Sequence, residues 1–421
     1  MTRLGPILIL LLAASGLAET LPVDDVDALV AAALADHPAV AAAAADGDMA
    51  AARVRVAGSL PDPVVMWGEM LEPVETRVGP QQRVLSVQQM VPWAGTLAAR
   101  REAASALGEA ASATEADVAV TVAANVYRAW ARAAWLADQQ DLVGRQLTLL
   151  ASLERSLRAG YEAGSGRYSD LLQVQLEQAR LADRLRGLAD EAPAALARLN
   201  AALGRDPAAP LTLPTGLEDA PPLVASTGSV HPQLVALDRR ARAAEFEARA
   251  AVRAGRPQFT LGLDWIQIGE AVMDGVADSG KDALVARLGM TLPIWRGKYD
   301  GARQAAEASR AALSFQREAR RQNLAARTLG AEVDRRDADR RVRLHRDDLL
   351  PRARQAYEAT LAAYRAGGGS LADVIGAERT LLSLEESLVA ARRDAWLATA
   401  DLNEAAGTVP GPASPMKRSE P

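Results

Sequence analysis

The sequence contains no cysteine, and among its 421 residues there are only three phenylalanines, six tyrosines and three histidines. The absence of cysteine excludes disulfides, thiol catalysis and zinc–thiolate sites. So few aromatic residues do not suit an ordinary layered core, whereas the abundance of Ala, Leu and Arg favours long helices packed side by side. The formal charge of −5 comes from interleaved acidic and basic residues, which excludes a basic footprint for nucleic acid.

Catalytic motifs are also missing from the sequence. It has no HExxH, GxSxG, Walker loop or dinucleotide fingerprint, so we expect neither an enzyme nor a cofactor. The histidines, His37, His231 and His345, are scattered along the chain and do not predict a metal site. Since His37 and His231 each precede a proline, a structural role is favoured for both.

Long apolar runs are confined to the first residues. The stretch MTRLGPILILLLAASGLAET has a basic Arg3, an apolar run, and small residues at Gly16 and Ala18. This order predicts a secretory signal peptide over residues 1–18, cut before Glu19. No later segment offers the ~18 uninterrupted apolar residues of a transmembrane helix.

The chain is an internal duplication. The phrase YEAGSGRYSDLL at 161–172 is repeated as YRAGGGSLADVI at 364–375, a separation of 203 residues. LNAALG at 199–204 and LNEAAG at 402–407 keep the same separation, and HPAV at His37 matches HPQL at His231. Such self-similarity predicts two copies of one structural unit of about 200 residues.

The duplication divides the chain into five parts. We expect repeat 1 at 19–204 and repeat 2 at 231–407. Between them lies a linker, 205–230, which contains five prolines, and a tail at 408–421 is expected to be disordered.

Each repeat is predicted to contain a helix, two strands and a long helical hairpin. Repeat 1 begins with a helix over 26–58 that is broken near His37–Pro38. The proline-free stretch from Gly95 to Gly160 predicts a helix roughly 100 Å long. A turn at 161–168 reverses the chain, and Ser169 is expected to cap the returning helix. In repeat 2, Pro351 predicts a break in the equivalent long helix.

The strands of repeat 2 alternate strictly. In QFTLGLDWI and DALVARLGMTLP, apolar residues recur at every second position, as in a strand with one face toward lipid and the other toward a watery lumen. A half-buried soluble sheet has the same period. The signal peptide and the long helices favour the membrane, and the expected lipid-facing residues are Phe259, Leu261, Leu263, Trp265, Leu284, Leu288 and Met290.

Four strands per chain have a consequence for assembly. Unpaired strand edges cannot lie in lipid, because each bare N–H or C=O group there costs several kcal/mol. About eight strands is the smallest practical barrel. The chain must therefore oligomerise to span a membrane, and a homotrimer would supply twelve strands.

The order of elements and several phrases resemble the TolC-like outer-membrane efflux factors. LPDPVV leads into the first strand, QQMVPWAGTLAARREAA and LPIWRGKYDGARQAA resemble the family's exits from the second strand of each repeat, and the sequence from Tyr364 to Gly407 resembles its second hairpin. The likeness extends over about residues 25–407. The P-W-x-G pattern is similar to the heavy-metal branch, whereas the lipidated cysteine of many relatives is absent here.

This resemblance implies a mainly α fold with a small β part. Long α-helical hairpins would form a periplasmic tunnel, and four strands per chain would contribute to a trimeric 12-stranded barrel. The protein would be the exit duct of a tripartite efflux or secretion system in a Gram-negative outer membrane. Its partners would be a periplasmic adaptor and an inner-membrane transporter, and the transporter would select the cargo.

The resemblance also implies site residues. The repeated turns would be the tips where the adaptor docks, with Gly164, Gly166, Gly367, Gly369, Tyr161 and Tyr364 as candidates. Asp373, with Asp170 and Glu378, would line the pore mouth; a second aspartate of some relatives is replaced by Gly376. Dipole stabilisation in a first helical turn is the favoured interpretation for Asp170 and an equal one for Asp373, and packing is favoured over partner contact for the two tyrosines.

The alternative prediction is a soluble periplasmic adaptor or scaffold built on long hairpins. It would keep the signal peptide and the helices, but it would need no lipid-facing strands.

Overall fold

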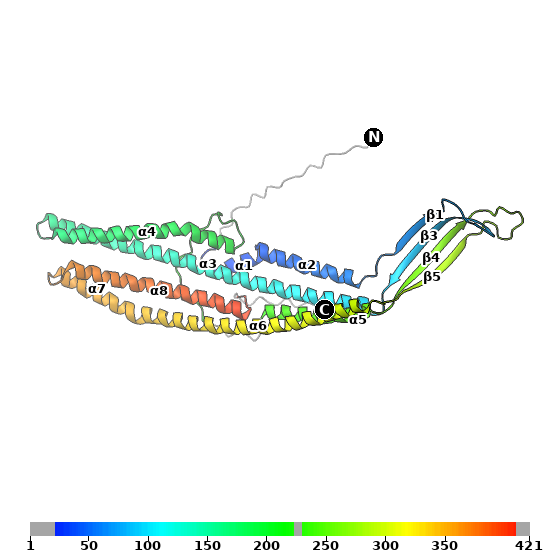
Figure 1. Ribbon diagram of the computed structural model, residues 1–421. Coiled ribbons are helices and arrows are strands. Elements are labelled where there is room, and N and C mark those ends of the chain that lie inside the picture. The colour runs from blue at the N-terminus through cyan, green and yellow to red at the C-terminus, as the bar shows by residue number, and fades with distance from the viewer. Residues whose placement is uncertain (1–21, 223–229, 410–421) are drawn as a thin grey trace, which may run out of the picture.

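The computed structural model describes residues 22–222 and 230–409. The predicted signal peptide and most of the tail lie outside these residues. Figure 1 shows an elongated molecule with a small sheet at one end and two helical turns at the other. The fold is mainly helical with a small antiparallel sheet, as the sequence predicted.

Repeat 1 begins with α1 (Val26–Asp36) and α2 (Pro38–Gly58), which meet at 43°. The strands β1 (Val64–Glu69), β2 (Glu75–Thr76) and β3 (Gly79–Val91) follow. The hairpin consists of α3 (Thr96–Glu162), about 100 Å long, and α4 (Tyr168–Ala202). The break at His37–Pro38 and the single long helix confirm the sequence prediction.

Repeat 2 has the same order of elements. It contains α5 (Pro232–Ala254), β4 (Gln258–Ile268), β5 (Ala283–Thr291), α6 (Arg296–Arg343), η1 (Leu344–Leu349), α7 (Leu350–Arg365) and α8 (Leu371–Ala406). In Figure 1 the long helices α3 and α6 run from the sheet toward the turns, with α4, α7 and α8 nearer the turns.

Two predictions about helix boundaries were wrong. Pro351 does not break the second long helix, because α6 passes through the π-helical turn η1 directly into α7. Pro351 is the second residue of α7, directly after the π-helical turn. The helix α4 starts one residue before Ser169, and Arg167 precedes it without a side-chain cap.

The sheet has the order β1-β3-β4-β5, and β2 adds a two-residue pairing to β3. All main pairings are antiparallel. In the part of the chain that the structure describes, β1 and β5 are the outer strands, and each pairs along one side only.

The hydrophobic core lies between the helices. Its largest cluster joins α1, α3, α4 and α8 with Leu203 and Leu217. No single helix within 22–222 and 230–409 meets the length and hydropathy expected of a membrane span, although the bent pair α1–α2 does when its two parts are taken together.

Candidate functional site

One face of the sheet is apolar across all four main strands. The register places Trp67 of β1 opposite Leu85 of β3, then Trp265 of β4, then Leu284 of β5. The neighbouring row is Val65, Val87, Leu263 and Ala286. Directly opposed residues share a face, so the less regular strands of repeat 1 continue the apolar face predicted from repeat 2.

This apolar face is open in the protomer. Leu261 and Leu288 are directly opposed and have 52% and 72% of their surface exposed. Leu263, Trp265, Leu284 and Met290 are exposed as well, and Phe259 is half-buried beside Trp93, with ring centroids 6.2 Å apart. An exposed apolar patch of this kind marks a surface that meets lipid or another protein.

The opposite face is more polar and contains an ion pair. Arg287 of β5 is directly opposite Gly262 of β4 and reaches to the buried carboxylate of Asp264. Gly262 carries no side chain on this face, and a Cβ there would lie 3.4 Å from Cβ of Arg287. The two faces therefore differ in chemistry, as they do in a strand between lipid and water.

The repeated phrase forms the two turns at the end opposite the sheet (Figure 1). Gly164 and Gly367 end the incoming helices with φ of 76° and 79°, in the left-handed region that glycine adopts readily. A Cβ at Gly166 would lie 2.7 Å from the backbone nitrogen of Tyr161, and one at Gly369 would lie 3.3 Å from that of Tyr364. The glycines thus permit two closely similar reversals.

The two tyrosines of the turns differ in their contacts. Tyr161 is exposed, and its ring centroid lies 5.5 Å from that of Tyr168. Tyr364 packs against the core and donates its hydroxyl to the carboxylate of Asp170 at 3.2 Å. Burial raises the pKa of the Tyr364 phenol, and the charge of Asp170 raises it further. Asp170 therefore links the first hairpin to the second.

Asp373 and Glu378 are in contrasting environments. Asp373 is exposed and forms a capping box with Ser370 at the start of α8. Its carboxylate accepts from the hydroxyl of Ser370 at 2.7 Å and from its backbone N–H at 3.2 Å, and these bonds lower its pKa. Glu378 is only 3% exposed and faces Glu177 of α4. Its carboxyl therefore offers almost no surface to solvent in the protomer.

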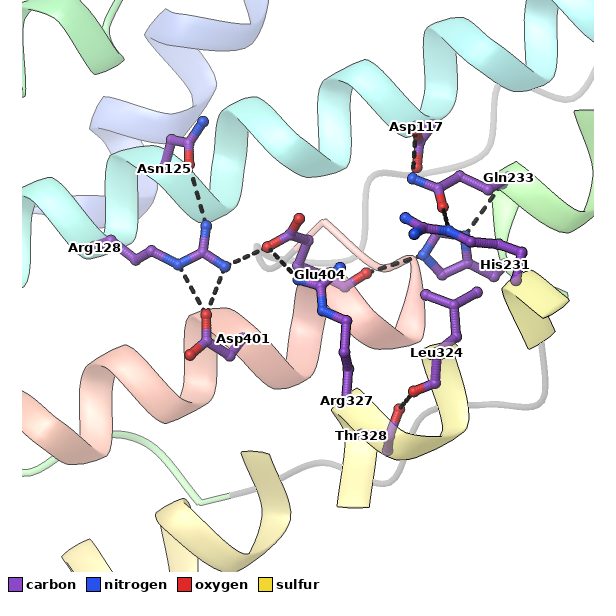
Figure 2. A network of polar contacts seen from close by, with 11 residues as sticks. Asp117, Asn125, Arg128, His231, Gln233, Leu324, Arg327, Thr328, Asp401 and Glu404 are labelled. Atoms are coloured by element: carbon purple, nitrogen blue, oxygen red, sulfur yellow. Dashed lines mark hydrogen bonds and ion pairs between the residues drawn. The ribbon is translucent and has the colours of Figure 1, made fainter. Parts of the chain in front are cut away.

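A network of charges joins the repeats where α3 and α8 cross the middle of the molecule. Figure 2 shows Arg128 of α3 donating to Asp401 at 2.8 Å and bonded to Glu404, both on α8. Arg327 of α6 lies 3.1 Å from Glu404. Burial alone would raise the pKa of Glu404, but the hydrogen bonds and charges of Arg128 and Arg327 together lower it.

The two predicted structural histidines begin equivalent helices. Nδ1 of His37 accepts from the N–H of Ala39 at 3.0 Å, and Nδ1 of His231 accepts from the N–H of Gln233 at 3.1 Å. An accepting Nδ1 places the proton of the neutral ring on Nε2. Each imidazole therefore acts as an N-cap, in agreement with the structural role predicted from the sequence.

The linker between the repeats lies across the same middle region. Asp138 of α3 accepts from the N–H groups of Gly216 and Leu217 at 3.2 and 3.0 Å. Arg335 of α6, buried, donates to the carbonyl oxygens of Ala220 and Pro221. The polar residues that bind this linker, and those of the network around Arg128, could not be predicted from the sequence, because they belong to different helices and carry no local motif.

Comparison with known proteins agrees with this geometry. Residues 226–408 match the outer membrane efflux protein family. No curated protein sequence matches the chain.

Three solved structures have the same fold. VceC of Vibrio cholerae is 20% identical with a TM-score of 0.72, over 91% of this chain and 96% of its own. The open-state MtrE channel of Neisseria gonorrhoeae is 18% identical with a TM-score of 0.72, over 92% and 89%. CusC is 16% identical with a TM-score of 0.72, over 92% and 94%.

These similarities do not favour one branch of the family. CusC, of the heavy-metal branch, aligns no better than VceC or MtrE. The family is one of transport proteins, not enzymes. Residues 226–408, which contain repeat 2, match the outer membrane efflux protein family, and both repeats share the fold of the solved channels.

Proposed function

We propose that the protein works as a homotrimeric exit duct, with its twelve main strands closed into one barrel in the outer membrane. The observation that carries this proposal is the sheet, which is apolar on one face and has two outer strands paired on one side only. In lipid, every unpaired backbone group on these edges would cost several kcal/mol. Pairing β5 of one protomer with β1 of the next removes both edges at once.

The lipid side of such a barrel would be the apolar face that contains Leu261 and Leu288. The lumen side would contain the pair Asp264–Arg287. This orientation is supported by the cost of a charged group in the hydrocarbon region, about 2–4 kcal/mol for arginine at the midplane. The opposite orientation would place both charges in lipid and the apolar rows in water.

The helical end would extend through the periplasm toward an adaptor and an inner-membrane transporter. The turns at Gly164 and Gly367 are the docking candidates, because they are alike in sequence and in backbone shape. Two turns per chain would give six around a trimer. Since both lie at the end farthest from the sheet, they are the parts of the chain nearest the inner membrane (Figure 1).

Asp373 is the best candidate for charge at the pore mouth. It is exposed, and its hydrogen bonds with Ser370 keep it ionised to a lower pH than a free aspartate. Three such carboxylates around a threefold axis would favour cations over anions. Asp170 is tied to Tyr364, and Glu378 is buried, so the charge of this ring would come mainly from Asp373.

Membrane extraction combined with cross-linking tests the proposal. A barrel resists carbonate washing and is released only by detergent, whereas the adaptor-like alternative washes off. Because the chain has no cysteine, Ala286→Cys in β5, combined in turn with a single cysteine at each position of β1, can report pairing between protomers in whatever register the closed barrel adopts. We expect a disulfide-linked ladder up to trimer. A carbonate-soluble monomer would refute the duct.

A further inference from the structure

The two hairpins of a protomer meet along a seam near the turns, formed by α4 and α8. Leu171, Val174 and Leu181 of α4 and Leu371, Val374 and Leu382 of α8 are buried in the same core. Two ion pairs cross the seam: Arg379 of α8 with Glu177 of α4, and Arg184 of α4 with Glu386 of α8 at 2.8 Å. The seam therefore alternates apolar contacts with charge pairs.

Two acidic residues are buried together inside this seam. Glu177 is 6% exposed and Glu378 is 3% exposed. The charge of Glu177 is matched by Arg379 and by Arg180, whose guanidinium lies 3.6 Å away. Within the described residues, Oε2 of Glu378 is buried without a hydrogen-bond partner. The charge of Glu177 is thus compensated by two arginines, whereas the carboxyl of Glu378 has no such partner in the described part of the chain.

The surroundings of Glu378 disfavour its negative charge. Glu378 faces Glu177 of α4 and is next to Arg379 on its own helix. It also lies near Tyr357 of α7, where burial raises the pKa of the phenol and the charge of Glu378 raises it further. Arg379, already bonded to Glu177, is the one cation that these contacts place beside Glu378.

Burial raises the pKa of Glu378 to about 7, and the charge of Glu177 acts in the same direction, against a smaller opposing effect of Arg379. A glutamate exposed to water has a pKa of about 4.3. The closed seam therefore holds a proton that a parted seam would release. The resulting stabilisation of the closed seam is complete below pH of about 4.3 and is lost as pH rises toward 7.

We propose that Glu378 is a proton-dependent lock between the two hairpins, closed when its carboxyl is neutral and released when it ionises against Glu177. The effect of this lock on the channel rests on the proposed function. Parting α4 from α8 would change the spacing between the two turns of each chain, which are the docking candidates. External alkalinity would then favour a wider arrangement of the turns, and acidity a narrower one.

Distance measurement between spin labels tests the lock. The native chain has no cysteine, so Ala179→Cys on α4 and Thr380→Cys on α8, both exposed, give one label pair across the seam in the full-length protein in lipid nanodiscs. Between pH 5 and pH 8 we expect the ratio of parted to closed seams to rise at least tenfold, since the proton linkage spans more than one pKa unit.

Variants separate the lock from ordinary pH effects. Glu378→Gln should keep the seam closed throughout the range, because its amide cannot ionise. Glu177→Gln frees Arg379 for Glu378 and should move the transition to lower pH. The control is Glu385→Gln, whose partner Arg354 lies within the same hairpin at 3.1 Å, and it should leave the profile unchanged.

Two results would overturn the inference: a seam distance in the wild type that does not respond to pH, or an equal response in Glu378→Gln. Channel conductance in planar bilayers distinguishes failure of the proposed duct from failure of the lock. If no variant conducts at any pH, the duct itself fails, whereas conducting channels with an unaltered pH response in Glu378→Gln refute only the lock.

Discussion

His231, at the start of repeat 2, is bonded to Glu404, in its last helical turn. With Nδ1 occupied as an N-cap, Nε2 of His231 donates to the backbone oxygen of Glu404 at 3.0 Å. The first and last helices of the repeat are thereby joined at one point (Figure 2). This contact therefore ties the two ends of repeat 2 together.

Replacing His231 should cost more stability than replacing its counterpart. His231→Ala removes an N-cap and also the bond from the buried ring to the carbonyl of Glu404, whereas His37→Ala at a half-buried site removes only the cap. We expect losses of about 2–3 and about 1 kcal/mol respectively. Thermal unfolding followed by circular dichroism in detergent measures both, and equal losses would contradict the role of the bond to Glu404.

Gly407 is expected to be intolerant of any side chain. It ends α8 with φ of 71°, and a Cβ there would lie 2.5 Å from Cδ of Pro232. Gly407→Ala therefore adds backbone strain to a clash and should destabilise by about 1–3 kcal/mol.

A matched control for Gly407→Ala is Gly187→Ala. Gly187 lies inside α4, and a Cβ added there would meet nothing within 4 Å, so alanine at this position should stabilise by up to about 1 kcal/mol. Unfolding midpoints of the two variants should move in opposite directions. A neutral Gly407→Ala would show that the contact with Pro232 can relax.

The Arg128 network should make stability depend on pH. Arg128→Met leaves Glu404 and Asp401 without their main cation and should cost about 1–3 kcal/mol at pH 7. In the native protein, the pKa of Glu404 is lowered on balance, so its contribution is present above the unfolded pKa and lost as pH falls. The stability gap between wild type and variant should therefore narrow as pH falls below about 4.3, the pKa of a glutamate exposed to water. A constant gap in urea unfolding would mean that Arg128 acts only through packing.

Charge on the apolar face of the sheet should block assembly in the outer membrane. Leu261→Arg or Leu288→Arg would place a guanidinium toward lipid and cost about 2–4 kcal/mol near the midplane. Thr291→Arg is the control, because Thr291 belongs to the same strand as Leu288 but to the other face. Membrane fractionation should show loss of the first two variants and normal assembly of the third. Normal assembly of all three would refute the lipid-facing assignment.

Much of the fold could be predicted because its signals are local. The repeated phrase, the proline-free helix from Gly95 and the alternation around Leu261 each occupy one stretch of sequence. The uninterrupted helix at Pro351 was not predicted, since the π turn at 344–349 accommodates the proline through a hydrogen-bond pattern without a sequence signature.

The site was less predictable because its contacts join distant helices. In the sequence, Glu378 is indistinguishable from any other glutamate of a helix. Only the fold places it beside Glu177, which lies 201 positions earlier in the chain. The same holds for Arg128 and Asp401. The position of Asp373 was easier to predict, because the capping box joins it to Ser370, only three residues earlier.

The turns offer the sharpest test of partner docking. Gly367 has φ of 79° and open space around it, so Gly367→Pro, which fixes φ near −65°, must reshape the turn without disturbing the distant sheet. Gly164→Pro should act alike at the first turn. We expect both variants to form trimers and to lose efflux, measured as tolerance to exported compounds in cells.

Gly368→Ala, at a neighbouring glycine with φ outside the left-handed region, is the control and should retain efflux. Unchanged tolerance in the proline variants would count against docking at the turns, whereas loss of the trimer would show that the turns serve assembly instead.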